Sequence, residues 1–271
     1  MLSVAGSDPS GGAGIQADLK TVEACGGYAV TAITSVTVQN TLGVRRVHAL
    51  EAALVADQLR ALLEDLDVAA VKTGMLGSPA VVEALAEMLQ ASPGRPLVVD
   101  PLLCSSTGHV LNGETTLASI TEHLAPLATL LTPNLTEAAE MTGLDVHSVT
   151  EAEQAGRRLL DSGWKAVLVK GGHRRSAVTT DLLIGRRGTR VFEGPRIERT
   201  NTHGTGCVHA SAIATGLARG MSLEQAVEAA REFVAGCIRH GLQLGHGVGP
   251  VDPLHRLHEA SSIDAREVSS P

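Results

Sequence analysis

The order of apolar and polar segments is the feature that most constrains the fold of this 271-residue chain. Short apolar runs rich in β-branched residues alternate with segments of helical period, a pattern that predicts strands joined by helices. The expected strands are 2–6, 29–38, 68–74, 96–100, 128–134 and 166–172, and the expected helices are 12–26, 51–66, 78–91, 113–124, 134–142 and 150–162. Parallel strands require such crossovers, so the sequence predicts an α/β sandwich with a mostly parallel sheet.

The last third of the chain shows a different order. A hairpin is expected around Arg186 to Gly188, followed by helices at 204–219 and 222–240. The sequence contains no repeat, low-complexity block or linker. We therefore predict a single domain over residues 1–259 and a polar, frayed tail over 260–271.

Composition excludes several classes of partner. Hydrophobic residues make up 44% of the chain, but only one Trp, one Tyr and two Phe are present, which argues against stacking of nucleic-acid bases. A net charge of -7 also disfavours nucleic acid and acidic membranes. The sequence shows no export signal, no apolar run of about 18 residues and no C-x-x-C pair. These features predict a cytoplasmic protein that acts on a small molecule.

Glycine-rich and polar turns follow several predicted strands, where open parallel sheets bind ligands. The first places Gly12, Gly14 and Ala17 in the G-x-G-x-x-A spacing of dinucleotide-binding proteins. That function needs an acid about 20 residues further on, but Gln39 is found there. A carboxamide donates and accepts at once, so it suits a base-like ring, and Asp18 could accept from an alcohol or amino group. A tight turn without a ligand is the alternative.

Two further turns carry charged side chains. Asp100 ends one predicted strand, and Asn134 and Glu137 begin the helix after another. Their oxygens could bind Mg²⁺ and its waters, or Asn134 and Glu137 could form only a capping box. Lys170 ends an apolar strand, where it could reach a phosphate or extend to solvent.

The sequence NTHGTGC precedes the predicted helix at 204–219. Gly204, Thr205 and Gly206 leave backbone N–H groups uncovered at a helix N-terminus, which favours binding of an anion such as phosphate. The same position lowers the pKa of a thiol, so Cys207 is a candidate base, with burial as a small apolar residue as the alternative. The P-loop pattern is missing from the sequence, so phosphate transfer would need another architecture.

Seven motifs together resemble a known enzyme family. In order along residues 3–252 they are AGSDPSGGAGIQADLKT, VQNT, KTGML, TPNLTEA, VKGGH, NTHGTGC and GVGPV. They are similar to motifs of the hydroxymethylpyrimidine and phosphomethylpyrimidine kinases of thiamin biosynthesis, in the ribokinase-like superfamily. The resemblance implies a three-layer α/β/α sandwich, a homodimer, and Mg²⁺. It also implies ATP-dependent phosphorylation of 4-amino-5-hydroxymethyl-2-methylpyrimidine and of its monophosphate.

The resemblance also assigns roles to individual residues. The pyrimidine contacts it implies are Ala13, Asp18, Gln39 and Met75, with Leu102 at a wall position. The anion hole it implies comprises Gly204, Thr205, Gly206 and Cys207, with Cys207 as general base; Asn134, Glu137 and Asp100 organise magnesium and phosphates, and Lys170 faces a phosphate. Ser106 departs from the family pattern, because many relatives have a lysine there. This departure leaves pyridoxine or pyridoxal kinase as the alternative activity, with a dinucleotide-dependent oxidoreductase or a ligand carrier as more distant ones.

Overall fold

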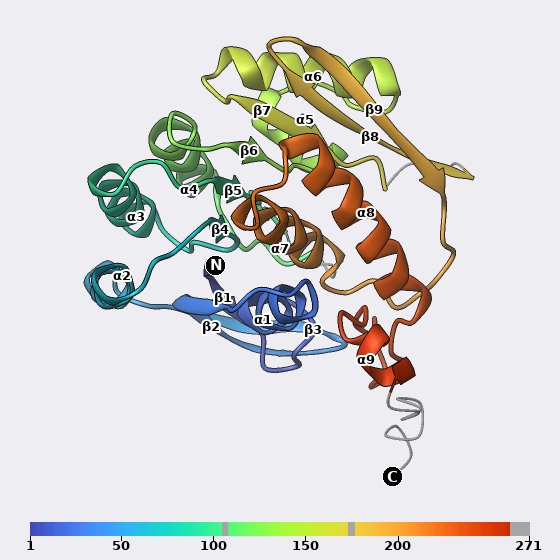
Figure 1. Ribbon diagram of the computed structural model, residues 1–271, viewed down its shortest axis with the longest axis horizontal. Helices are drawn as coiled ribbons and strands as arrows, with labels where there is room; N and C mark the ends of the chain where they lie inside the picture. Colours follow the sequence, from blue (N-terminus) through green and yellow to red (C-terminus); the bar gives the residue numbers. More distant parts are fainter. Residues whose placement is uncertain (105–107, 173–176, 261–271) are drawn as a thin grey trace.

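A computed structural model describes residues 1–104, 108–172 and 177–260 of the chain (Figure 1). The strands in these residues are β1 (Leu2–Ser7), β2 (Val30–Asn40), β3 (Gly43–Ala49), β4 (Val71–Thr73), β5 (Leu97–Val99), β6 (Leu130–Leu131), β7 (Ala166–Val169), β8 (Val178–Gly185) and β9 (Gly188–Pro195). They form one sheet in the order β3-β2-β1-β4-β5-β6-β7-β8-β9. Ser106 and the predicted tail from residue 261 onward lie outside the described residues.

The centre of the sheet is parallel and its edges are antiparallel. Strands β2, β1, β4, β5, β6 and β7 pair in parallel, whereas β3, β8 and β9 are antiparallel to their neighbours. The predicted hairpin is confirmed, because Gly185 pairs with Gly188. Strand β3 was not predicted. It is an edge strand with no fully buried side chain, so it lacks the apolar signal of the central strands.

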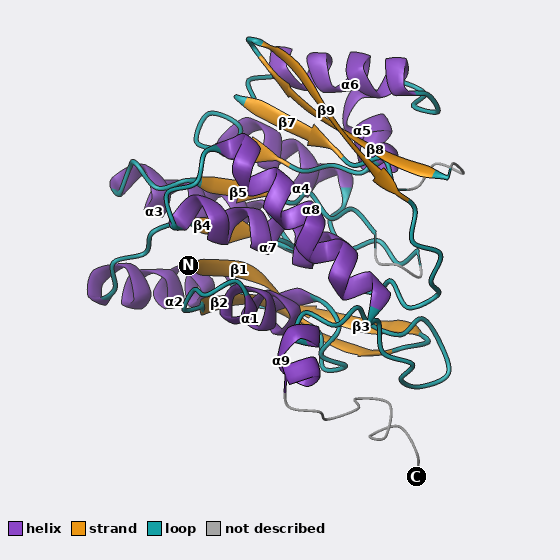
Figure 2. Cartoon of the chain, turned by 45° about the vertical axis from the view of Figure 1, so that its right-hand side comes forward, coloured by secondary structure: helices purple, strands orange, loops and turns teal. Residues whose placement is uncertain are grey.

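Helices cover both faces of the sheet (Figure 2). They are α1 (Gly14–Ala24), α2 (Ala52–Asp65), α3 (Pro79–Ala91), α4 (Glu114–Ser119), the short π-helical turn η1 (Ile120–Leu124), α5 (Leu135–Thr142), α6 (Val149–Asp161), α7 (Thr205–Ala218), α8 (Leu223–Arg239) and α9 (His255–Ala260). The short helix α9 was not predicted. In the described part of the chain, no helix is both long and apolar enough to cross a membrane.

Successive residues of the buried strands belong to two different apolar cores, one on each face of the sheet. In β5, Leu97 and Val99 pack with side chains from α2, α3, α5 and α6, whereas Val98 packs with side chains from α1, α7 and α8. This follows from the period of a strand, in which successive side chains point to opposite faces. Both faces of the central strands are therefore buried, which confirms the predicted three-layer α/β/α arrangement.

A buried ion pair joins the sheet to the helices on one face. Lys72 of β4 places its Nζ 2.8 Å from each carboxylate oxygen of Asp18 in α1, and both side chains are fully buried. The hydroxyls of Ser3 in β1 and Ser211 in α7 donate to the same carboxylate. The carboxylate of α1 therefore accepts hydrogen bonds from two strands and from a second helix.

Removing one partner of this pair is expected to cost far more than removing both. Lys72→Met leaves the Asp18 carboxylate buried without its counter-ion, which typically costs about 3–5 kcal/mol of unfolding free energy. The double variant Lys72→Met/Asp18→Asn avoids that charge and should recover most of the loss. Urea denaturation of both variants measures the difference.

An exposed pair provides the control. Arg60 and Asp57 pair at the surface of α2, so Arg60→Met should cost less than about 1 kcal/mol. Equal losses for the single and double variants at the buried pair would contradict the ion-pair account.

Candidate active site

A cavity of about 1420 Å³ lies where the parallel strands end. Residues that follow β1, β4, β5, β6 and β7 line it together with the N-terminus of α7, as expected for an open parallel sheet. Twelve of the thirteen site residues predicted from the sequence line it; they are Ala13, Gln39, Met75, Asp100, Leu102, Asn134, Glu137, Lys170, Gly204, Thr205, Gly206 and Cys207. Residues that are far apart in the sequence are thus brought to one site.

Asp18 is the exception. It is fully buried and is not among the residues that line the cavity. Its carboxylate already accepts hydrogen bonds from Lys72, Ser3 and Ser211. Asp18 was expected to contact a substrate directly, but the structure places it in a buried ion pair that engages both of its oxygens, away from the cavity surface.

The turn before α7 requires glycine. Gly204 has φ +83, in the left-handed region, and a Cβ atom there would lie 1.8 Å from the carbonyl oxygen of Gly12. A side chain would separate the turn from the glycine-rich loop after β1. The N–H of Thr205 donates to Thr202 O at 3.3 Å. The next N–H groups of α7, at Gly206 and Cys207, have no carbonyl four residues earlier in the helix, so they are available to an anion.

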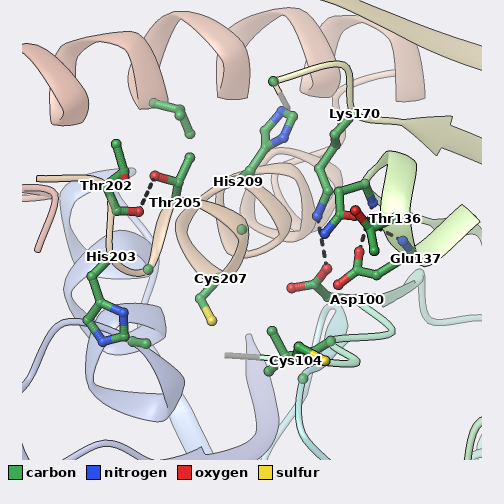
Figure 3. A pocket seen from close by; sticks show the side chains of 18 of the residues that line it. Asp100, Cys104, Thr136, Glu137, Lys170, Thr202, His203, Thr205, Cys207 and His209 are labelled. Carbon is green, nitrogen blue, oxygen red and sulfur yellow. Dashed lines mark hydrogen bonds and ion pairs between the residues drawn. The ribbon is translucent and has the colours of Figure 1, made fainter. Parts of the chain in front are cut away.

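This turn faces a buried pair of opposite charges. A Cβ atom on Gly206 would lie 3.6 Å from both Asp100 Oδ2 and Lys170 Nζ. Lys170 Nζ is 3.1 Å from Asp100 Oδ1 (Figure 3). Because Gly206 has no side chain, the helix N-terminus and the Lys170 ammonium are open to the same small volume. The arrangement offers two sources of positive potential to one anion.

Cys207 points into the cavity between His203 and Asp100 (Figure 3). Its side chain is almost completely buried, and burial raises the pKa of the thiol to about 11, although the Lys72 ammonium and a hydrogen bond from the Gly14 backbone act to lower it. The expectation of a lowered pKa is therefore wrong for the ligand-free protein. Desolvation of the thiolate outweighs the effect of the helix N-terminus.

Asp100, Glu137 and Lys170 form an electrostatically coupled group. Burial raises the pKa of Glu137, an effect that the Lys170 ammonium opposes. Burial alone would lower the pKa of Lys170, but the Asp100 and Glu137 carboxylates raise it above its ordinary value. The group therefore holds an ammonium between two acids inside the protein.

The same acids fit a hard cation. Asp100 Oδ2 is buried and has no hydrogen-bond partner among the described residues. Magnesium prefers oxygen ligands and keeps several waters, so one or two carboxylates beside a phosphate are sufficient for it. Within the described residues, no cluster of three or more His, Cys, Asp or Glu side chains that could hold a metal ion occurs.

Asn134 and Glu137 do form the capping box that was one of the alternatives. Asn134 Oδ1 accepts from the Glu137 N–H at 3.0 Å, and Glu137 Oε2 accepts from the Asn134 N–H at 2.7 Å. Both residues nevertheless line the cavity. The cap fixes the position of the Glu137 carboxylate, so the structural and functional interpretations are compatible.

A network at the opposite end of the cavity was missed in the sequence. His203 Nε2 lies 2.9 Å from Asp8 Oδ2 and 3.3 Å from Gln39 Nε2. Burial would raise the pKa of Asp8, but hydrogen bonds from His203 and Ser10 lower it to about 2. Asp8 and His203 belong to two of the recognised motifs, but their spacing of 195 residues gives no signal of this contact.

Two more cavity residues were missed. Burial lowers the pKa of His209 to about 4, and its Nε2 has no hydrogen-bond partner in the described part of the chain. Asn112 holds the loop after β5, because its Oδ1 accepts from the N–H groups of Leu76 and Gly77 while its Nδ2 donates to Pro101 O at 2.8 Å. An isolated His or Asn carries no sequence signal for either role.

Leu102 has a strained backbone at the cavity wall. Its φ of +42 lies in the left-handed region, where a residue other than glycine costs about 1–3 kcal/mol. Asn112 Nδ2 also donates to Leu102 O at 3.3 Å. The surrounding hydrogen bonds therefore hold Leu102 in an unfavourable conformation beside the position expected for a ligand.

Comparison with known proteins gives a consistent result. The family model for phosphomethylpyrimidine kinase matches residues 8–252. A hydroxymethylpyrimidine/phosphomethylpyrimidine kinase of Streptomyces coelicolor is 45% identical over 252 residues, which cover 93% of each chain.

Solved structures show the same relationship. A Staphylococcus aureus pyridoxal kinase in complex with pyridoxal superposes with a TM-score of 0.85 at 32% identity, covering 93% of this chain and 92% of that one. A phosphomethylpyrimidine kinase from Clostridium difficile 630 gives a TM-score of 0.76 at 38% identity, covering 86% and 96% of the two chains. With its glycine turn, buried cysteine and acid–lysine group in one cavity, the chain belongs to the phosphomethylpyrimidine kinase family.

Proposed function

We propose that this protein transfers the γ-phosphoryl group of ATP to the hydroxymethyl oxygen of 4-amino-5-hydroxymethyl-2-methylpyrimidine, and then phosphorylates the resulting monophosphate to the diphosphate, in thiamin biosynthesis. The observation that carries this proposal is the position of Cys207. It lines the same cavity as the Gln39 carboxamide, which suits a heteroaromatic ring, and the Lys170 ammonium, which suits a phosphate. The 45% identity to a kinase of this name supports the same assignment.

The acceptor alcohol binds at the end of the cavity formed by Ala13, Gln39, Met75 and Leu102. Gln39 pairs with the ring edge, because its amide can donate and accept at once. Met75 and Leu102 supply apolar contact for the ring faces and its methyl group. This placement directs the hydroxymethyl group toward Cys207.

The transferred phosphoryl group binds at the N-terminus of α7. Phosphoryl transfer depends mainly on positioning and charge neutralisation, which preorganised N–H groups and a lysine provide. The N–H groups at Gly206 and Cys207 and the Lys170 ammonium serve this purpose. Arg199 and Arg231 also line the cavity, and Arg231 is ion paired there with Asp181.

Asp100 and Glu137 would hold Mg²⁺, which neutralises phosphate charge when bound. Cys207 acts as the general base. As the substrate oxygen forms its bond to the γ-phosphorus and the bond to ADP breaks, the hydroxyl proton passes to the sulfur of the Cys207 thiolate. The resemblance-based predictions of a homodimer and a cytoplasmic location stay predictions.

Pyridoxal kinase activity is the second candidate. The similarity to a pyridoxal kinase with bound pyridoxal favours it, because the two folds superpose over nearly the whole chain. Both substrates are heteroaromatic alcohols, so steady-state rates on the aminopyrimidine alcohol and on pyridoxine, measured in parallel with ATP and Mg²⁺, decide between them. We expect higher kcat/KM for the pyrimidine; the reverse order would overturn the proposal.

Gln39→Leu should weaken recognition of the pyrimidine specifically. An unpaired buried polar group costs about 1–3 kcal/mol, so kcat/KM for the pyrimidine should fall roughly five- to a hundredfold while the KM for ATP changes little. Gln58→Leu is the matched control, because Gln58 bonds the Ile33 backbone outside the cavity. Equal losses in the two variants would refute the assigned role of Gln39.

Cys207→Ala should reduce kcat about a hundred- to ten-thousandfold and leave substrate affinity largely unchanged, as expected for loss of a general base. Because burial raises the pKa of the thiol to about 11, the wild-type kcat should increase with pH between pH 7 and 9. Cys207→Asp should retain partial activity without that increase, since a carboxylate is already ionised there.

A second buried cysteine serves as the control for this experiment. Cys237 is fully buried in α8 and does not line the cavity, so Cys237→Ala should keep the wild-type rate and pH profile. A wild-type kcat in Cys207→Ala would show that another group takes the proton.

Glu137→Gln tests the metal assignment. Glutamine still serves in a capping box, so the fold should be retained, but loss of the carboxylate should raise the Mg²⁺ concentration for half-maximal rate several-fold. Glu151→Gln alters the equivalent capping box of α6, away from the cavity, and should leave that concentration unchanged. Unchanged magnesium dependence in Glu137→Gln would limit Glu137 to its capping role.

A further inference from the structure

The Gln39 side chain is held from both sides within the cavity. On one side lies His203, whose Nε2 is 3.3 Å from the Gln39 amide. On the other side, Thr37 Oγ1 lies 3.3 Å from the position of Gln39 Oε1. The orientation of a carboxamide follows from what its neighbours can donate and accept. The donor and acceptor groups of His203 and Thr37 therefore determine which end of the Gln39 amide faces each of them.

Asp8 determines that the Nε2 atom of His203 carries a hydrogen. Asp8 Oδ1 accepts from the N–H and the hydroxyl of Ser10, and Oδ2 accepts from the Ala13 N–H at 2.9 Å. A carboxylate engaged in this way is an acceptor only. The His203 Nε2 at 2.9 Å from Oδ2 must therefore carry a hydrogen. A ring nitrogen that carries a hydrogen has no lone pair, so it cannot accept a hydrogen bond from the Gln39 NH₂ group.

Thr37 leads to the same conclusion independently. Its hydroxyl lies 3.0 Å from the Ser7 carbonyl oxygen, which can only accept. A hydroxyl has one hydrogen, so the Thr37 oxygen presents its lone pairs to the Gln39 amide. The group facing Thr37 must then be the NH₂ and the group facing His203 must be the carbonyl oxygen, so Oε1 and Nε2 of Gln39 exchange places relative to the two contacts given above.

We propose that Asp8 and His203 on one side, and Thr37 on the other, lock the Gln39 amide with its oxygen toward His203 and its NH₂ toward Thr37. This inference rests on the proposed function, in which Gln39 contacts the substrate ring. Asp8 and His203 are thereby positioning residues for substrate selection. The locked amide offers the ring one acceptor and one donor in a fixed order.

The fixed order distinguishes two closely similar rings. A 4-aminopyrimidine presents a donor, the amino group, beside an acceptor, the ring nitrogen, and so complements the locked amide. The 4-oxo analogue presents a carbonyl acceptor beside a ring N–H donor, which reverses the order. An amide free to turn by 180° would bind both rings. With a locked amide, the 4-oxo ring places its N–H donor against the amide NH₂ and its carbonyl acceptor against the amide oxygen, so neither hydrogen bond forms.

The test compares kcat/KM for the 5-hydroxymethyl-2-methyl alcohols of the 4-amino and 4-oxo rings. Wild-type protein should prefer the 4-amino ring by roughly ten- to a hundredfold or more, because at least one polar pair is lost with the other ring. In His203→Phe, where only Thr37 still holds the amide, the preference should fall at least threefold, mainly through a lower KM for the 4-oxo ring. Asp8→Asn removes the obligatory acceptor with little change in size and should also relax the preference.

Two further variants separate positioning from stability. His203→Gln supplies an amide that can donate to Asp8, so it should restore most of the preference. His255→Phe is the matched control, because His255 is as deeply buried as His203 but does not line the cavity. It should leave the preference at the wild-type value even where it lowers the thermal unfolding temperature.

The outcomes distinguish this inference from the proposed function. Wild-type protein that phosphorylates neither pyrimidine overturns both. Wild-type protein that phosphorylates both rings equally well, or a wild-type preference maintained in both His203→Phe and Asp8→Asn, overturns the lock alone. Where His203→Phe does not fold, the ratio of kcat/KM for the 4-amino and 4-oxo rings in Asp8→Asn decides by itself whether the lock exists.

Discussion

The buried ion pair between Lys72 and Asp18 is the interaction on which the geometry of the cavity depends. It joins β4 to α1, and through Ser3 and Ser211 it also ties in β1 and α7. The N-termini of both helices held in this way face the cavity. With α1 and α7 fixed against the sheet, the loop after β1 and the turn before α7 can pack backbone against backbone at Gly12 and Gly204.

Electrostatics divides the cavity into two ends with different chemistry. Near α7, the Lys170 ammonium interacts with the buried carboxylates of Asp100 and Glu137. Two acids beside one ammonium favour the binding of an additional positive charge there. At the other end, Asp8 is stabilised as a carboxylate by local hydrogen bonds and determines the hydrogen on His203. Cys207 lies between the ends, and its burial raises the pKa of its thiol to about 11. The thiolate that accepts the substrate proton is therefore a minor form at neutral pH and becomes more populated as the pH rises.

Many features of the fold could be predicted because they depend on local patterns. The central strands are continuous apolar runs since both faces are buried, and the helices between them follow from their period. Strand β3 escaped prediction because an exposed edge strand needs no apolar alternation. Glycine at position 204 marked the start of α7 correctly, since the left-handed conformation there is a local requirement.

The sequence by itself determined the order of elements, the glycine turns and the types of residue at the ends of the strands, because each of these depends on neighbours within one or two turns of the chain. Only the tertiary structure decided which charges meet. Asp18 pairs with Lys72 instead of facing the cavity, and His203 contacts Asp8 across 195 positions. Burial likewise reversed the expected shift in the pKa of Cys207. The physical reason is that pairing and desolvation depend on distance in space, which the spacing of residues along a chain does not specify.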